Sequence, residues 1–134
     1  MMEYSLFTDG GSRNNPGQAA IGVVLYRGQE EIANLSNAIG IATNNAAEYQ
    51  ALLAGLELAL RHKVKDLDCY LDSELVVRQL KREYRVKDKD LAVLFAKVVQ
   101  LSDRFSHIRF SHIERAKNKR ADQLVNQALD QLGA

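Results

Sequence analysis

Apolar residues recur along the first third of the chain in three runs that are typical of β-strands. The runs cover residues 3–9, 19–27 and 31–42, and polar or glycine-containing segments separate them. Short connections between consecutive strands favour antiparallel pairing, so the pattern predicts a three-stranded meander. The first connection, GGSRNNPGQ, is longer than the two-residue loop of a tight hairpin. We therefore expect the first strand to end on Asp9 and a glycine- and asparagine-rich loop to follow it.

From residue 44 onward the apolar spacing changes to the period of a helix. A helix over 44–60 carries one apolar face, made of Ala47, Ala51, Ala54 and Leu58. Thr43 or Asn44 can cap its start, since both side chains accept hydrogen bonds from free backbone N–H groups. The pattern thus places a long amphipathic helix directly after the meander.

The rest of the chain alternates strands with helices. The pattern predicts a short buried strand over 67–71, helices over 73–82 and 89–103, a strand over 107–113 and a helix over 118–132. The resulting order, βββαβααβα, predicts an α/β fold. We expect a five-stranded mixed sheet, with three antiparallel strands followed by two strands that alternate with helices, flanked by helices in a single domain over 1–134.

Composition adds few constraints to this fold. With 134 residues, 46% of them hydrophobic and 26% charged, the chain resembles an ordinary globular domain. The single cysteine, Cys69, excludes an internal disulfide. The first residues carry neither a signal peptide pattern nor a long apolar run, so we expect a cytoplasmic protein without a membrane span. A net charge of +1 means that a polyanion would be held by local basic runs, such as 81–89 and 115–120, rather than by bulk charge.

Four acidic residues occupy ends of the predicted elements. Asp9 ends the first strand, Glu48 lies in the first turn of the first helix, Asp72 joins the fourth strand to its helix, and Asp122 lies in the first turn of the last helix. Ligands of α/β sheets gather at such strand ends. A structural explanation also exists for each acid alone, because carboxylates are favoured near helix N-termini and Asp72 can act as a helix cap.

Considered together, the four acids point to a cation. Several carboxylates that converge at one place raise each other's pKa unless a cation neutralises them. A site made of oxygen ligands alone suits Mg²⁺ or Mn²⁺. Two such ions about 4 Å apart can clamp the attacking and leaving oxygens of a phosphodiester.

Two other chemistries fit the sequence less well. The segment GGSRNNPG lacks the Gly-Lys-Ser/Thr ending of a P-loop and leads into a strand, where a dinucleotide fingerprint requires a helix. His62, His107 and His112 have no Gly-x-Ser-x-Gly partner, and the last two fall inside a predicted strand.

Four motifs in order make the chain similar to a known family. The segments TDGGSRNNPG, TNNAAEYQALLAGL, LDSELVVRQL and NKRADQLVNQAL resemble type 1 ribonuclease H, the endonucleases that cut the RNA strand of RNA/DNA hybrids. The resemblance covers nearly the whole chain. It implies the ribonuclease H fold and hydrolysis that leaves 5′-phosphate and 3′-hydroxyl ends.

The resemblance also assigns roles to the acids. Asp9, Glu48, Asp72 and Asp122 would be the catalytic, metal-binding carboxylates. They would hold two Mg²⁺ ions, or Mn²⁺ in their place, once substrate is bound. Asp9 would lie between both ions, Asp122 would help hold the ion near the attacking water, and Glu48 with Asp72 would hold the ion near the leaving oxygen.

The resemblance further implies how substrate is recognised. The backbone of Gly10 and Gly11 and the side chain of Asn15 would read the minor groove of the hybrid. Asn44 and Asn45 would make the matching contacts from the first helix, and Thr43 would grip a phosphate of the DNA strand. Small residues and amides suit this task, because RNA is distinguished by its 2′-hydroxyl groups in a shallow minor groove.

Three features depart from the family pattern. Glu74 stands where many members have glutamine, which alters one predicted groove contact. The connection KREYRVKDKD lacks the basic, tryptophan-bearing protrusion of some members, so we expect a modest, salt-sensitive affinity for hybrid. The loop before Asp122 is short and His112 precedes it in a strand, so His112 is not assigned as a mobile catalytic histidine. Glu114, Arg115 or Lys117 is the alternative candidate for assisting product release.

The leading interpretation is therefore a hybrid-specific endonuclease that acts on RNA/DNA hybrid without an obligatory protein partner. Two alternatives remain open. One is a nucleic-acid-binding module that kept the fold and lost catalysis. The other is a nuclease of the same fold that acts on double-stranded RNA. The intact acids favour an enzyme, and the asparagine-rich segments favour the hybrid.

Overall fold

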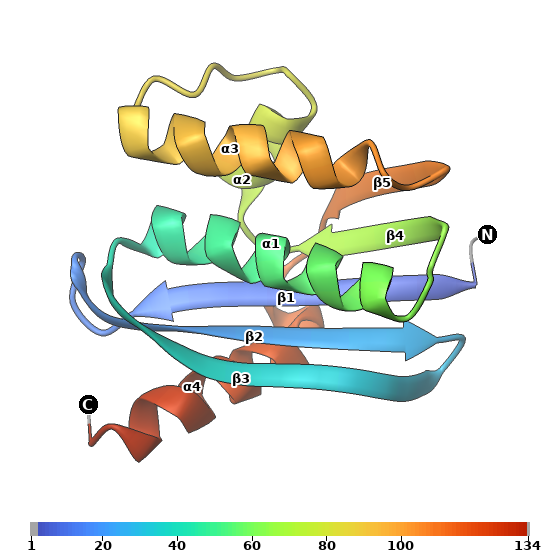
Figure 1. Cartoon of the computed structure of the whole chain (residues 1–134). Coiled ribbons are helices and arrows are strands. Elements are labelled where there is room, and N and C mark those ends of the chain that lie inside the picture. Colours follow the sequence, from blue (N-terminus) through green and yellow to red (C-terminus); the bar gives the residue numbers. More distant parts are fainter. Residues whose placement is uncertain (1–2, 134) are drawn as a thin grey trace.

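A single five-stranded sheet organises the chain in the computed structural model, which describes residues 3–133. The strands are β1 (Tyr4–Ser12), β2 (Gly17–Arg27), β3 (Glu30–Ala42), β4 (Asp66–Leu71) and β5 (His107–His112). Their spatial order is β3-β2-β1-β4-β5 (Figure 1). The first three strands pair antiparallel, whereas β1 with β4 and β4 with β5 pair parallel. The predicted mixed sheet is confirmed.

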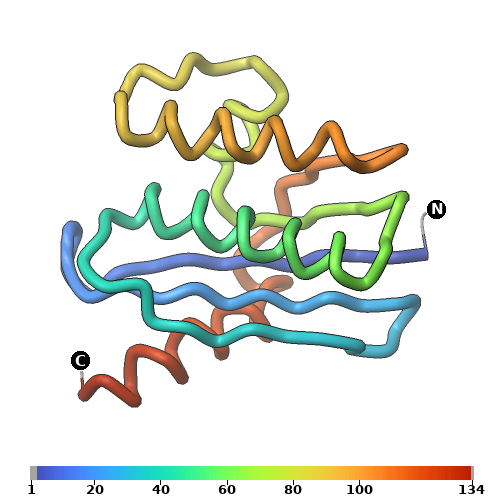
Figure 2. The backbone as a smooth tube through the Cα atoms, viewed as in Figure 1, coloured from blue at the N-terminus to red at the C-terminus, as the bar shows by residue number. Residues whose placement is uncertain are grey.

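Helices cover both faces of this sheet. They are α1 (Asn44–Arg61), α2 (Glu74–Leu80), α3 (Lys89–Ser102) and α4 (Lys119–Gln131), with a short 3₁₀ turn at Arg115–Lys117. Helix α1 packs on β1 and β2 with α3 beside it, and α4 packs on β2 and β3 from the opposite side (Figures 1 and 2). The sheet is therefore the middle of three layers.

The apolar positions that predicted the elements form the core. Leu6, Val23 and Leu25 from the sheet meet Leu52 and Leu56 of α1, and all five are completely buried. A second, smaller contact joins β2 to α4. Strand β2 is buried at every residue from 19 to 25, because helices α1 and α4 cover both faces of the sheet at this strand.

The first hairpin differs from the prediction. Strand β1 continues past Asp9 to Ser12, and β2 already begins at Gly17, so the loop covers only residues 13–16. Gly10, Gly11 and Ser12 pair with Ile21, Ala20 and Ala19 of β2. Glycine is a poor strand former, but pairing with a buried neighbouring strand overrides that local preference.

Among residues 3–133, none of the helices is both long enough and apolar enough to cross a lipid bilayer. The cytoplasmic location and the single-domain organisation stay predictions.

Candidate active site

Asp9 and Asp72 lie close together at the point where the parallel strands β1 and β4 stop pairing. Strand β1 pairs with β4 only as far as Thr8, which lies opposite Leu71, the last residue of β4. Asp9 and Asp72 are the next residues of the two segments. Asp9 itself keeps its antiparallel partner, Gly22 of β2. The prediction that Asp9 ends its strand was wrong, but it does lie where β1 loses one neighbour.

Glu48 reaches the same place because α1 lies very close to β1. A Cβ atom on Gly10 would lie 2.2 Å from the carbonyl oxygen of Ala47, so only glycine permits this approach. The backbone N–H of Gly10 donates a hydrogen bond to Glu48 Oε1. Glu48 is the fifth residue of α1, one position beyond the first turn in which it was predicted.

Asp122 approaches from the other face of the sheet. It lies in the first turn of α4, as predicted. A Cβ atom on Gly22 would lie 2.1 Å from the carbonyl oxygen of Ala121, the residue before Asp122. Gly22 is also the partner of Asp9 in the sheet. The two close approaches, at Gly10 and Gly22, thus bring both helices to opposite sides of Asp9.

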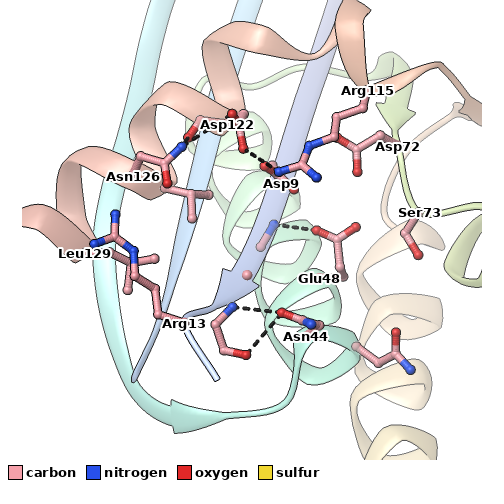
Figure 3. A pocket seen from close by; sticks show the side chains of 15 residues that line it. Asp9, Arg13, Asn44, Glu48, Asp72, Ser73, Arg115, Asp122, Asn126 and Leu129 are labelled. Carbon is pink, nitrogen blue, oxygen red and sulfur yellow. Dashed lines mark hydrogen bonds and ion pairs between the residues drawn. The ribbon is translucent and has the colours of Figure 1, made fainter. Parts of the chain in front are cut away.

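The four carboxylates line one groove, as Figure 3 shows. One oxygen each from Asp9, Glu48 and Asp72 lies within 4.8 Å of the other two. Asp122 lies beside this triad and contributes to the electrostatic environment of Asp9. One Asp122 oxygen is 3.5 Å from a guanidinium nitrogen of Arg115.

Burial and mutual repulsion favour protonation of two of these acids. Asp9 is 9% exposed and Glu48 is 7% exposed. Burial, followed by the charge of Asp72, raises the pKa of Asp9 from 3.8 to about 7. Burial and the charge of Asp9 likewise raise the pKa of Glu48 well above its ordinary value. The groove therefore concentrates negative charge that is costly at neutral pH without a cation.

This donor set fits a divalent metal ion. Its ligand atoms are carboxylate oxygens, which suit Mg²⁺ or Mn²⁺ better than softer ions. The triad leaves Asp72 half-exposed, so the acids are open to the groove rather than enclosed in the core. A cation there would offset the repulsion that raises the pKa of Asp9 and Glu48.

Four of the six predicted substrate contacts line the same groove. Its volume is about 440 Å³, and Gly10, Gly11, Asn44 and Asn45 lie along it with the acids. The side-chain oxygen of Asn44 accepts hydrogen bonds from the backbone N–H and hydroxyl of Ser12, at 2.9 and 3.1 Å. This bond joins the end of β1 to the start of α1. It was not anticipated from the sequence.

Asn15 and Thr43 lie in a neighbouring groove of about 750 Å³, which Asn45 also lines. The side-chain oxygen of Asn15 accepts a hydrogen bond from the backbone N–H of Asn44. Thr43 caps α1 by accepting from the backbone N–H of Ala46, at 3.1 Å. The six predicted residues thus follow a continuous path from the acids across the start of α1.

The structure also places the residues of the three features that depart from the family pattern. Glu74 is exposed, pairs with Arg78 at 3.4 Å and does not line the groove of the acids. His112 is the last residue of β5, is exposed and also stays outside that groove. Of Glu114, Arg115 and Lys117, only Arg115 lines it. Arg115 is therefore the member of this set that can contact a ligand beside the acids.

Two amides near Asp122 were missed by sequence reasoning. The side-chain nitrogen of Asn126 donates to the carbonyl oxygen of Asp122 at 3.1 Å, and their spacing of four residues on one helix could have indicated it. Asn118 is 1% exposed and donates to an oxygen of Asp72. Nothing in the local sequence distinguishes Asn118 from an ordinary helix cap.

Residues 7–128 match the family model described as reverse transcriptase-like. The chain is 43% identical to a ribonuclease HI of Halobacterium salinarum, across 92% of this chain and 63% of the relative. It is 34% identical to a ribonuclease H of Hydrogenovibrio crunogenus, across 98% of this chain and 99% of the relative. It matches a bifunctional protein of Mycobacterium tuberculosis at 39% identity, but spans only 36% of that protein's length.

Solved structures agree with these relatives. An RNase H1 isolated from compost superimposes with a TM-score of 0.91 at 42% identity, and all of both chains is covered. The same enzyme in complex with RNA/DNA hybrid gives a TM-score of 0.92 at 40% identity, across 98% of this chain and 99% of that one. Together with the match over residues 7–128, these likenesses show that the chain belongs to the type 1 ribonuclease H family.

Proposed function

We propose that this chain is an endoribonuclease that hydrolyses the RNA strand of RNA/DNA hybrids with the help of divalent cations. The observation that carries the proposal is one groove in which four carboxylates adjoin a wall of glycine backbone and asparagine side chains. The acids suit cation-assisted phosphodiester hydrolysis, and the wall suits a minor groove that displays 2′-hydroxyls. A related RNase H1 has been solved in complex with RNA/DNA hybrid.

Asp9, Glu48 and Asp72 are the residues that would hold a cation, with Asp122 assisting from the other side of Asp9. When two Mg²⁺ ions are bound, they supply positive charge to the attacking and the leaving oxygen of the phosphodiester. In the hydrolysis, a water oxygen bonds to phosphorus and the bond from phosphorus to the 3′-oxygen breaks. The 3′-oxygen gains a proton, and the products carry 5′-phosphate and 3′-hydroxyl ends.

The other groove residues would position the hybrid for this reaction. Gly11 and the amides of Asn44 and Asn45 would face the minor groove, where amides can donate to and accept from 2′-hydroxyls. Asn15 would add a contact to the minor groove, and Thr43, in the same neighbouring groove, would hold a phosphate of the DNA strand. The Gly10 N–H binds Glu48 and so also positions that acid, while a contact between the Gly10 backbone and the minor groove stays a prediction.

The test is cleavage of a labelled hybrid beside matched double-stranded RNA and double-stranded DNA, with Mg²⁺, with Mn²⁺ and with chelator. We expect cation-dependent cutting of the hybrid's RNA strand only, reduced at least 1,000-fold in Asp72→Asn, on the order of 4 kcal/mol of transition-state stabilisation. Equal cutting of double-stranded RNA would contradict the specificity for hybrid, and cutting of double-stranded RNA alone would make it the substrate instead. Hybrid binding without cutting under any metal would support a silent binding module instead.

Asp103→Asn is the matched control, because Asp103 is an exposed aspartate that follows the last residue of α3 and lines neither groove. It should cleave at the wild-type rate. If it lost activity like Asp72→Asn, the effect would reflect overall charge rather than this site.

A further inference from the structure

Asn118 connects the separate segments that carry three of the four acids. Its side-chain nitrogen donates to the carbonyl oxygen of Thr8, the residue before Asp9, and to Asp72 Oδ2, each at 2.9 Å. Its backbone carbonyl accepts from the N–H of Asp122 at 3.1 Å. One residue thus links β1, the end of β4 and the start of α4 beside the groove.

The usual structural reason for asparagine at this position is missing. Asn118 precedes α4, yet its side chain makes no capping hydrogen bond to the helix. Its Oδ1 atom is buried without a hydrogen-bond partner, which is costly in a folded protein. Asn118 thus carries one unpaired polar atom at a point where its amide nitrogen contacts Asp72.

The geometry points to Asn118 as a positioning residue that fixes the orientation of the Asp72 carboxylate for cation binding. Both of its N–H groups are used, one on the rigid strand β1 and one on Asp72, so the carboxylate is tied to the sheet. Asp72 otherwise follows the last residue of β4 and precedes a short helix, where its side chain could rotate. The bond occupies Oδ2 and leaves Oδ1 for a cation.

This inference rests on the proposed function and adds a residue that does not line the groove of the acids. Partners that orient metal ligands typically contribute 10- to 100-fold to metal affinity or activity. We therefore expect Asn118→Ala to raise the Mn²⁺ or Mg²⁺ concentration for half-maximal cleavage about 10-fold or more. The KM for hybrid at saturating metal should change less than about 2-fold, because Asn118 does not contact substrate.

The experiment measures binding of Mn²⁺ alone, from the electron paramagnetic resonance signal of free Mn²⁺, and metal-dependent cleavage by the same proteins. Asn118→Asp serves as a second variant, since it keeps the side-chain volume and places a carboxylate against Asp72 Oδ2 and the Thr8 carbonyl. All assays run at a temperature where urea titrations show each variant to be folded. Weaker Mn²⁺ binding in both variants, with cleavage restored by excess metal, supports the inference.

Gln79→Ala is the matched control. Gln79 is a buried amide that also makes two hydrogen bonds, to the Tyr49 hydroxyl at 2.5 Å and to the Arg85 carbonyl at 3.5 Å, away from the groove. It should lose stability without a change in metal dependence. Unchanged Mn²⁺ binding in a folded Asn118 variant overturns the inference. The proposed function still holds in that case if the wild-type protein cleaves hybrid. A wild-type protein that neither binds Mn²⁺ nor cleaves overturns both.

Discussion

At the scale of single residues, Asp9 carries a large electrostatic cost in the groove. Its carboxylate is buried, and Glu48, Asp72 and Asp122 surround it. The hydrogen bond from the Gly10 N–H partly offsets the rise in the pKa of Glu48, but not the rise in the pKa of Asp9. The ionisation of Asp9 should therefore respond to a bound cation.

The stability of the metal-free protein should fall as pH rises. The pKa of Asp9 is about 7 in the folded state against 3.8 as the ordinary value, so its contribution is fully present below pH 4 and lost as pH rises through 7. Asp9→Asn should remove the contribution of Asp9 to this dependence, and its unfolding free energy should exceed that of wild type by about 1 to 3 kcal/mol at pH 8. Urea unfolding in the presence of chelator, at pH values from 4 to 8, measures this pH dependence of the unfolding free energy.

Mg²⁺ gives the complementary result. At pH 8 it should raise the melting temperature of the wild-type protein more than that of Asp9→Asn, because binding to the folded state adds stability. A wild-type stability that rises from pH 4 to 8 in chelator would contradict the electrostatic account.

Arg115 is the residue of the short 114–117 segment that we expect to assist turnover. It lines the groove and lies 3.5 Å from Asp122, and its exposed guanidinium can bind a phosphate. Arg115→Ala should lower kcat about 10-fold, whereas Glu114→Ala and Lys117→Ala should stay within about 2-fold of wild type. Steady-state kinetics on hybrid would decide; wild-type turnover in all three variants would exclude a role for this segment.

Residue types, their places in the predicted elements and the family resemblance pointed to the four acids that line one groove, but not to the residues that support them. Carboxylates at the ends of predicted elements can be recognised from the sequence, because ligand sites gather there. The bond from Gly10 to Glu48 and the bonds of Asn118 depend on how separate segments pack. Such contacts join positions 38 to 110 residues apart, so no local pattern encodes them.

At the scale of elements, type and order were predictable while boundaries were not. Strand β1 gains three residues from pairing with β2, and Glu48 falls one position beyond the first turn of α1. Local patterns register apolar faces, whereas strand ends depend on the partner strand. The close approach of α1 and α4 to the sheet could not be predicted from the sequence either, because it depends on which atoms lie opposite Gly10 and Gly22.

Gly22→Ala should displace α4 and with it Asp122. The new methyl group would lie 2.1 Å from the Ala121 carbonyl oxygen, so the helix must shift. We expect a loss of about 2 kcal/mol or more in unfolding free energy and a lower kcat. Urea unfolding and steady-state cleavage measure the two effects.

Gly11→Ala provides the comparison for this change. Its nearest neighbours would be 3.9 and 4.0 Å away, which are ordinary contacts. Stability should therefore stay close to wild type, even though Gly11 lines the groove and its substitution can impair hybrid binding. Equal stability of the Gly11→Ala and Gly22→Ala proteins would show that the close approach of α4 is not required.

At the scale of the whole molecule, the charge distribution should limit the affinity for the proposed hybrid substrate. The net charge is only +1. The second groove combines Thr43 and Asn15 with the acids Asp88 and Asp90, which oppose a phosphate backbone. The short connection over 81–88 supplies basic residues but forms no helix or strand of its own. Affinity should therefore depend on a small number of contacts.

Asp90→Asn should strengthen hybrid binding at low salt. Removing one exposed charge beside the proposed path of the DNA strand should lower KM about 2- to 5-fold, and the gain should disappear at high salt, where exposed charges are screened. Asp103→Asn, which lies outside both grooves, should leave KM unchanged. An equal gain in both variants would point to net charge rather than to the second groove.

The most direct test of the central claim is the rate at which the wild-type protein cuts the RNA strand of a 5′-labelled hybrid in Mg²⁺, compared with Asp72→Asn and with chelator. The account predicts rapid cutting that leaves 3′-hydroxyl ends, lost in chelator and in the variant. Cutting that persists without divalent cations, or that survives the loss of Asp72, would contradict it.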